Sequence, residues 1–123
     1  MTRFAAGQVW TYRDALSDKT RAIIGRVEDV ESEPVIHVSI TDVPLPEDIV
    51  PGGATVTIAH APFGLESFAN SVLELERTGA QMIEGFEGGY QEWATEEGGY
   101  YTVTVAESIA MVFEALSDEE DEE

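Results

Sequence analysis

The chain of 123 residues carries six lysines and arginines against 25 aspartates and glutamates, which gives a formal net charge of −19. This charge disfavours binding to DNA, RNA or an anionic membrane, because lysine and arginine provide most of that affinity. The chain has no cysteine, which excludes disulfides and thiolate catalysis. Its length fits one domain, and it contains neither the apolar run of a secretion signal nor that of a membrane span. We therefore expect a single-domain cytoplasmic protein.

The charge is divided unevenly along the chain. Residues 1–26 hold five bases and two acids, whereas residues 27–123 hold one base and 23 acids. The first segment is therefore the one place where the charge favours an anion. The acidity of the rest has two explanations: it serves solubility, including solubility in salt, or it forms a surface that docks a basic partner protein.

Four segments of the first half have the pattern of strands. Ile36, Val38 and Ile40 alternate with polar residues, which predicts a strand with one buried face and one solvent-exposed face. Trp10 and Tyr12 share a face of the first segment. Clusters of proline and glycine separate the later segments. The strands are expected at residues 8–13, 20–27, 35–41 and 54–60.

The second half changes to a helical period. Apolar residues recur at spacings of three and four at Leu65, Phe68, Val72 and Leu75. This stripe predicts a helix that ends at Gly79, because glycine favours the positive φ of a helix C-cap. A second helix is expected from about Gly89 to Glu97, followed by an extended run over residues 100–103.

The last helix has the clearest start. Thr104 and Glu107 have the spacing of a capping box, in which each side chain accepts a hydrogen bond from the other residue's amide. The apolar stripe of this helix contains Ile109, Val112, Phe113 and Leu116.

Together these elements predict an α+β fold. It consists of an antiparallel meander of four or five strands, with an SH3-like curl as one variant, covered on one face by two or three helices. The domain is expected to span residues 1–116, and the acidic run 117–123 is expected to be a disordered tail. An exposed sheet edge leaves a homodimer open.

Histidine is the side chain that titrates near neutral pH, and the chain has two. Counting by twos places His60 on the same face as Val56 and Ile58, at the corner before the first helix. There it is a weak catalytic candidate, and a structural hydrogen bond to the backbone is the more ordinary interpretation. His37 falls opposite Ile36 and is expected to be solvated.

The aromatic residues provide a candidate binding site. Tryptophan and tyrosine often anchor a partner, and an outward-facing pair beside a base would recognise a peptide or a small anion. If they face inward, they belong to the core. The candidate binding residues are Trp10, Tyr12, Arg13, Tyr90 and Trp93.

Catalytic and metal motifs are absent from the sequence. No serine lies in a Gly-x-Ser-x-Gly setting, and the glycine-rich stretches lack the lysine of a phosphate-binding loop. The two histidines have no local metal-ligand spacing. The sequence therefore indicates no cofactor and no metal site.

Five segments carry a resemblance to a known family. They begin with Gly7-Gln8-Val9-Trp10, continue through the strand at 35–40, and include His60-Ala61-Pro62-Phe63, Tyr90-Gln91-Glu92-Trp93 and residues 101–107. The set resembles a family of small, uncharacterised bacterial proteins with Gly-Gln-Val-Trp, His-x-Pro-Phe and Tyr-x-x-Trp elements. The resemblance covers nearly the whole chain and implies a stand-alone domain, but no activity or site residue.

Two functional hypotheses remain. The first is a non-enzymatic, acidic protein-binding domain, similar in manner to an inhibitor or immunity protein. The alternative is a small enzyme or ligand-binding protein that uses His60 and nearby carboxylates in a pocket at the corner between the sheet and the first helix. The sequence favours the first, because it combines high negative charge with the absence of catalytic motifs.

Overall fold

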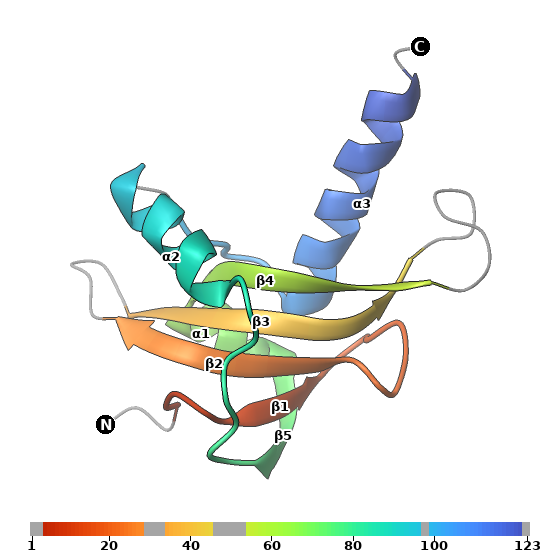
Figure 1. Ribbon diagram of the computed structural model, residues 1–123. Coiled ribbons are helices and arrows are strands. Elements are labelled where there is room, and N and C mark those ends of the chain that lie inside the picture. The colour runs from red at the N-terminus through yellow and green to blue at the C-terminus, as the bar shows by residue number, and fades with distance from the viewer. Residues whose placement is uncertain (1–3, 29–33, 46–53, 97–98, 122–123) are drawn as a thin grey trace.

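The computed structural model describes residues 4–28, 34–45, 54–96 and 99–121. Five antiparallel strands form one open sheet in the order β4-β3-β2-β1-β5, so that β4 and β5 are its edges (Figure 1). The α+β class and the antiparallel meander are confirmed. The strands are β1 (Val9–Tyr12), β2 (Arg21–Glu28), β3 (Val35–Pro44), β4 (Thr55–Gly64) and β5 (Val72–Arg77), and the helices are α1 (Leu65–Ser71), α2 (Phe86–Thr95) and α3 (Val105–Asp121).

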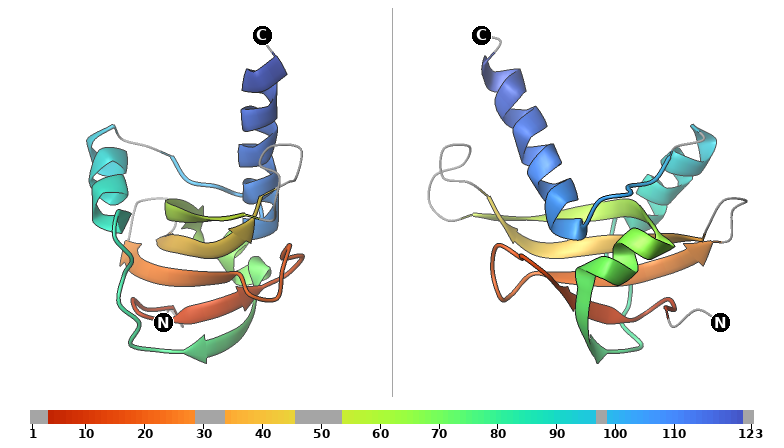
Figure 2. Two further views of the ribbon diagram at one scale, coloured as in Figure 1. Left: turned by 45° about the vertical axis from the view of Figure 1, so that its right-hand side comes forward. Right: turned by 180° about the vertical axis from the view of Figure 1, so that it is seen from behind.

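Helices cover both faces of the sheet. The larger core lies on one face, where Phe68 of α1 and Val105 of α3 are buried against Ile36, Val38 and Ile40. Helix α2 lies on the opposite face (Figure 2). Two helices, α1 and α3, therefore cover the face on which two or three helices were expected, and α2 covers the other face. A second covered face also explains why β3 is buried on both sides from Val35 to Ile40.

A β-bulge in β2 and another in β4 change which residues near the histidines share a face. In β2, Ile24 pairs with Val38 but Arg26 pairs with His37, so Gly25 is an extra residue. In β4, Ala61 pairs with Val38 whereas Ile58 pairs with Ile40, so two residues of β4 oppose Ser39. A bulge of this kind reverses the alternation of side chains beyond it.

The β4 bulge moves His60 to the other face of the sheet. Ile58 and Ala61 both contribute to the larger core although they are three residues apart. His60 therefore lies on the α2 face, opposite to Ile58, and the predicted placement of His60 on the core face is wrong. The pairing of β4 with β3 up to Gly64 also separates His60 from the start of α1.

The first helix is shorter than its apolar stripe predicts. Helix α1 ends at Ser71, and Val72 begins β5, the strand that pairs with β1. Leu75 lies opposite Trp10 in this pairing, and Val72 lies opposite Tyr12. The pairing with β1 therefore overrides a helical spacing, a tertiary effect that a local period does not contain.

Helix α3 begins as its capping box predicts. The amide of Thr104 donates to Glu107 Oε1 at 3.0 Å, and the amide of Glu107 donates to Thr104 Oγ1 at 3.2 Å. The helix continues past Leu116 to Asp121. The preceding extended run pairs with β4 through a bridge between Tyr101 and Phe63. The disorder of the acidic tail stays a prediction.

Candidate functional site

A chain of hydrogen bonds links three strands and a helix on the α2 face. His60 Nε2 of β4 lies 2.9 Å from His37 Nδ1 of β3. His37 Nε2 lies 3.2 Å from Glu28 Oε1 at the end of β2. The hydroxyl of Tyr90, on α2, donates to the same Glu28 oxygen at 3.0 Å. The four side chains come from β2, β3, β4 and α2, so the tertiary fold alone brings them together.

The chemistry of Glu28 fixes the direction of these bonds. An ionised carboxylate only accepts hydrogen bonds, so His37 carries its proton on Nε2 and donates it to Glu28. A neutral imidazole then has an unprotonated Nδ1, which accepts from the Nε2–H of His60. His60 in its neutral form therefore has a lone pair on Nδ1.

The Nδ1 atom of His60 is not fully buried. This atom has no hydrogen-bond partner among the described residues, and no buried side-chain nitrogen or oxygen in that part of the chain lacks one. His60 itself is half-buried, whereas His37 is fully buried. The chain of hydrogen bonds therefore has one accessible end, and that end is a base.

Burial keeps both histidines neutral. Desolvation, followed by repulsion from His60, lowers the pKa of His37 from 6.5 to about 4. Desolvation also lowers the pKa of His60. On the other side of Glu28, burial and the bond to the carboxylate raise the pKa of the Tyr90 hydroxyl. At neutral pH the site therefore contains two neutral imidazoles and a neutral phenol.

Aromatic rings enclose the two imidazoles. The ring of Trp93 lies 4.6 Å from that of His37, edge to face, and the ring of Phe86 lies 5.6 Å from that of His60. The guanidinium of Arg26 lies 4.6 Å from the centre of the Tyr90 ring and 3.8 Å from Glu28 Oε1. These contacts exclude water from His37 and hold Tyr90 against the carboxylate.

Two glycines allow α2 to approach the sheet this closely. A Cβ at Gly89 would lie 2.7 Å from His60 Cβ, and a Cβ at Gly25 would lie 2.4 Å from the Phe86 ring. Helix α2 begins after Gly85, whose φ of 98° favours glycine. The helix thus starts three residues before the predicted Gly89 and ends at Thr95.

The predicted binding residues are divided between the two faces of the sheet. Trp10 and Tyr12 are buried in the larger core, so they form no outward-facing aromatic patch. Arg13 is exposed and its Nε donates to the carbonyl of Asn70. Tyr90 and Trp93, by contrast, belong to the histidine site on the opposite face. The five residues therefore do not form one surface.

His37 is one of two site residues that the sequence analysis missed. It is fully buried, so the expectation of a solvated strand residue is wrong. Glu28 was also not singled out, because one carboxylate among 25 acids has no distinguishing local pattern. The one available signal was that a chain with two histidines places both in adjacent predicted strands.

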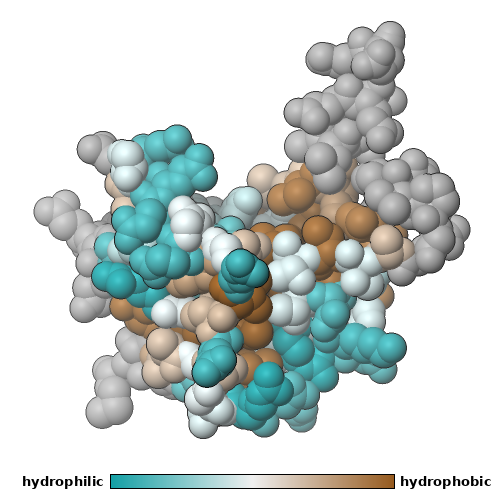
Figure 3. Space-filling view, in the orientation of Figure 1, coloured by the Kyte–Doolittle hydropathy of each residue, from teal (hydrophilic) through white to brown (hydrophobic). Residues whose placement is uncertain are grey.

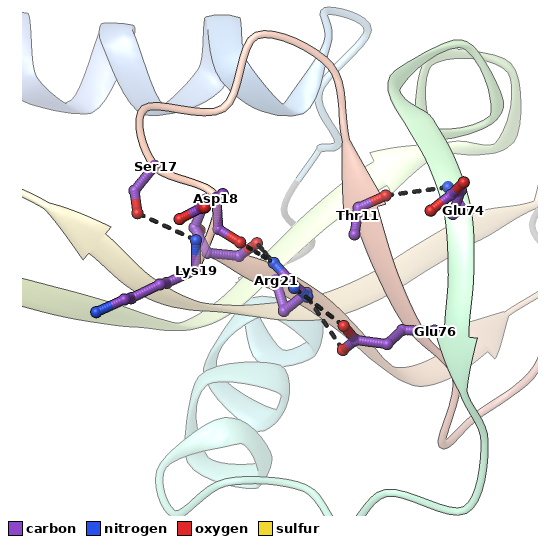
Figure 4. Close-up of polar contacts among 8 residues, drawn as sticks. Thr11, Ser17, Asp18, Lys19, Arg21, Glu74 and Glu76 are labelled. Atoms are coloured by element: carbon purple, nitrogen blue, oxygen red, sulfur yellow. Dashed lines mark hydrogen bonds and ion pairs between the residues drawn. The ribbon is translucent and has the colours of Figure 1, made fainter.

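The basic N-terminal segment is partly neutralised within the fold. Arg21 forms a two-pronged ion pair with Glu76 of β5, with nitrogen–oxygen distances of 3.0 and 2.9 Å (Figure 4). Its Nη1 donates to the carbonyls of Asp18 and Thr20. The guanidinium of Arg21 is therefore already occupied, which weakens the case for an anion site in this segment.

Within the described part of the chain, no three His, Cys, Asp or Glu side chains are grouped so that they could hold a metal ion. In the same residues, no helix has the length and apolarity that crossing a bilayer requires. No protein-family model, curated protein or solved structure matches the chain. The family resemblance suggested by the sequence thus stays a prediction.

Proposed function

We propose that this protein exchanges a proton with a bound small molecule through His60, with His37 and Glu28 as positioning residues. The observation that carries this proposal is the chain of close contacts from Glu28 through His37 to His60, whose Nδ1 has no hydrogen-bond partner among the described residues. This is the enzyme or ligand-binding alternative of the sequence analysis. The sequence analysis expected this site at the start of the first helix, whereas His60 lies beneath α2.

The chain of bonds supports each protonation state of His60. When Nδ1 accepts a proton, His60 becomes an imidazolium that still donates its Nε2–H to His37 Nδ1. His37 donates in turn to the carboxylate of Glu28, which stabilises the positive charge through the intervening ring. A general base oriented by a second group, itself held by a carboxylate, follows the logic of known catalytic triads.

The protonation equilibrium of His60 suits a base at neutral pH. Its pKa lies below the ordinary 6.5 because the ring is desolvated. Most molecules therefore hold His60 in the proton-accepting form at pH 7, which is the form that a general base requires. A cluster that served packing alone would not need a fully buried imidazole bonded to a half-buried one, since apolar side chains fill such a space at lower cost.

Acylation by 4-nitrophenyl acetate tests whether His60 Nδ1 is an accessible, supported base. We expect the wild-type protein to release 4-nitrophenolate with a rate that follows the deprotonation of His60, and His60→Gln to lower the rate about tenfold or more. Mass spectrometry should locate the acyl group on His60. An unchanged rate in His60→Gln, or acylation at the N-terminal amine alone, would refute the proposal.

A matched pair of glutamate variants separates the supported base from an ordinary surface histidine. Glu28→Gln removes the carboxylate that orients His37, so the rate should fall while His60 stays in place. Glu84→Gln makes the same change of charge at an exposed position near the start of α2. Equal rates in the two variants would contradict the positioning role of Glu28.

The acidic protein-binding hypothesis remains a second proposal. Its predicted aromatic anchors do not support it, because Trp10 and Tyr12 are buried. A different feature favours it, namely an apolar groove beside the acidic helix α3. This groove lies on the opposite face of the sheet from His60. A test of one proposal therefore does not decide the other.

A further inference from the structure

An apolar groove lies between the turn after β1 and the first turns of α3. It has a volume of about 120 Å³. That space suits one inserted side chain better than a whole ligand. Its lining consists of Tyr12, Asp14, Leu16, Ala106, Ile109, Ala110 and Phe113.

The walls of the groove are apolar and partly open to solvent. Leu16 is 60% exposed on the turn. On the helix, Ala106, Ile109, Ala110 and Phe113 have the spacing of one helical face. Ile109 is buried at the base of this face, whereas Phe113 remains partly exposed farther along. Leucine and phenylalanine flanking a hollow in this way are typical of a surface that receives an apolar side chain.

Helix α3 leaves the sheet beyond this groove. In both views of Figure 2 and in Figure 1 its C-terminal part stands away from the sheet, and Figure 3 shows apolar surface gathered at its base. The helix therefore offers a side to another molecule without any rearrangement of the core.

Charge selects the kind of molecule that fits. Residues 105–123 contain eight acids and no base. A second copy of the chain would bring the same charges, and two proteins of formal charge −19 repel each other. A segment that carries lysine and arginine beside its apolar residues is attracted instead.

We propose that this groove docks a basic amphipathic helix of another protein. One apolar anchor enters the hollow between Leu16 and Phe113, and basic residues beside it face the exposed carboxylate of Glu114. This is the helix-in-groove mode, in which the apolar spacing provides specificity and charge accelerates association.

A synthetic peptide of lysine and leucine tests the docking. The probe is a helix of ~15 residues with leucine at i, i+3, i+4 and i+7. Its control has the same composition with the leucines scrambled. We expect the patterned peptide to bind at least about tenfold more tightly than the scrambled one, and to shift backbone amide signals of Leu16 and of α3 around Ala110. Equal affinity for both peptides would mean that they bind through general charge attraction alone, which would overturn the proposal.

Two leucine variants locate the binding on the protein. Leu16→Ser removes one wall of the groove and should weaken binding by the patterned peptide about tenfold, because the anchor loses its apolar contact. Leu75→Ser is the matched control, since Leu75 is 44% exposed on β5. Equal loss in both variants, or none in Leu16→Ser, contradicts the proposed site. A dimer of the wild-type chain in sedimentation that Leu16→Ser converts to a monomer would assign the surface to a second copy instead.

Discussion

His37 and His60 face each other from adjacent strands, with ring nitrogens 2.9 Å apart and rings nearly parallel at 18°. A regular β4 would place His60 on the opposite face from His37, because Ile58 lies on the core face. The bulge in β4 is therefore what creates the pair. Since bulges often re-aim a side chain next to a functional site, this one is the backbone feature on which the histidine site depends.

Neighbouring glycines in α2 provide a matched test of the close approach. Gly89→Ala places a methyl group 2.7 Å from His60 Cβ, whereas a Cβ at Gly88 meets nothing within 4 Å. Alanine in a helix is worth up to about 1 kcal/mol over glycine. We expect Gly88→Ala to raise the melting temperature, and Gly89→Ala to lower the free energy of unfolding by roughly 1–3 kcal/mol through overpacking.

Thermal denaturation of both variants checks this expectation, and the histidine ring signals report whether the site moves. Displacement of the His60 resonances should accompany Gly89→Ala and be absent in Gly88→Ala. Stabilisation by both substitutions would mean that α2 does not approach His60 as described.

The buried histidines make stability depend on pH. The pKa of His37 is about 4 in the folded protein against an ordinary 6.5, because burial and His60 disfavour the charged ring. Between these values the unfolded chain binds the proton more tightly, so the free energy of unfolding falls as pH falls from 6.5 towards 4. The groups that face His37 are His60, Glu28, Arg26, Tyr90 and Trp93.

Chemical denaturation at about pH 7 and about pH 5.5 measures this effect while most carboxylates remain ionised. Wild-type protein should be less stable at the lower pH. In His37→Gln the free energy of unfolding should change less between the two pH values, whatever the absolute stability of the variant. If the free energy of unfolding changed equally with pH in the wild-type protein and in His37→Gln, the titrating group would not be His37.

The larger core gives a second prediction about the sheet. Val38 is fully buried between α1 and α3 on one side and pairs with Ala61 of β4. Val38→Asp would place an unpaired carboxylate in this core, at a cost that exceeds the stability of most domains of this size. Loss of cooperative unfolding in circular dichroism is expected. The matched substitution Val56→Asp, at a 36% exposed position on β4, should leave the fold intact.

Much of the sheet was predictable because its signals are local. Alternation in residues 35–41 and the β-branched residues near Ile24 identified strands without knowledge of their partners. The capping box located the start of α3 for the same reason, since Thr104 and Glu107 bond to each other's backbone. In these cases the residues that specify the structure are neighbours in the sequence.

The histidine site was not predictable in this way. His60 was assigned to the wrong face because the β4 bulge is specified by pairing with β3 and not by the residues of β4 alone. His37 was expected to be exposed because nothing in its own strand indicates that α2 covers the second face. Similarly, Val72 and Leu75 fit a helical stripe, and only the presence of β1 beside them makes them a strand.

The tautomers of the two histidines test the central claim most directly. Nitrogen chemical shifts of the imidazole rings at about pH 7 distinguish protonated from unprotonated nitrogen atoms. A one-way chain from Glu28 to solvent requires His37 and His60 both to carry the proton on Nε2, with Nδ1 of His60 unprotonated. A proton on Nδ1 of His60, with Nε2 accepting from His37, would reverse the chain and remove the accessible base.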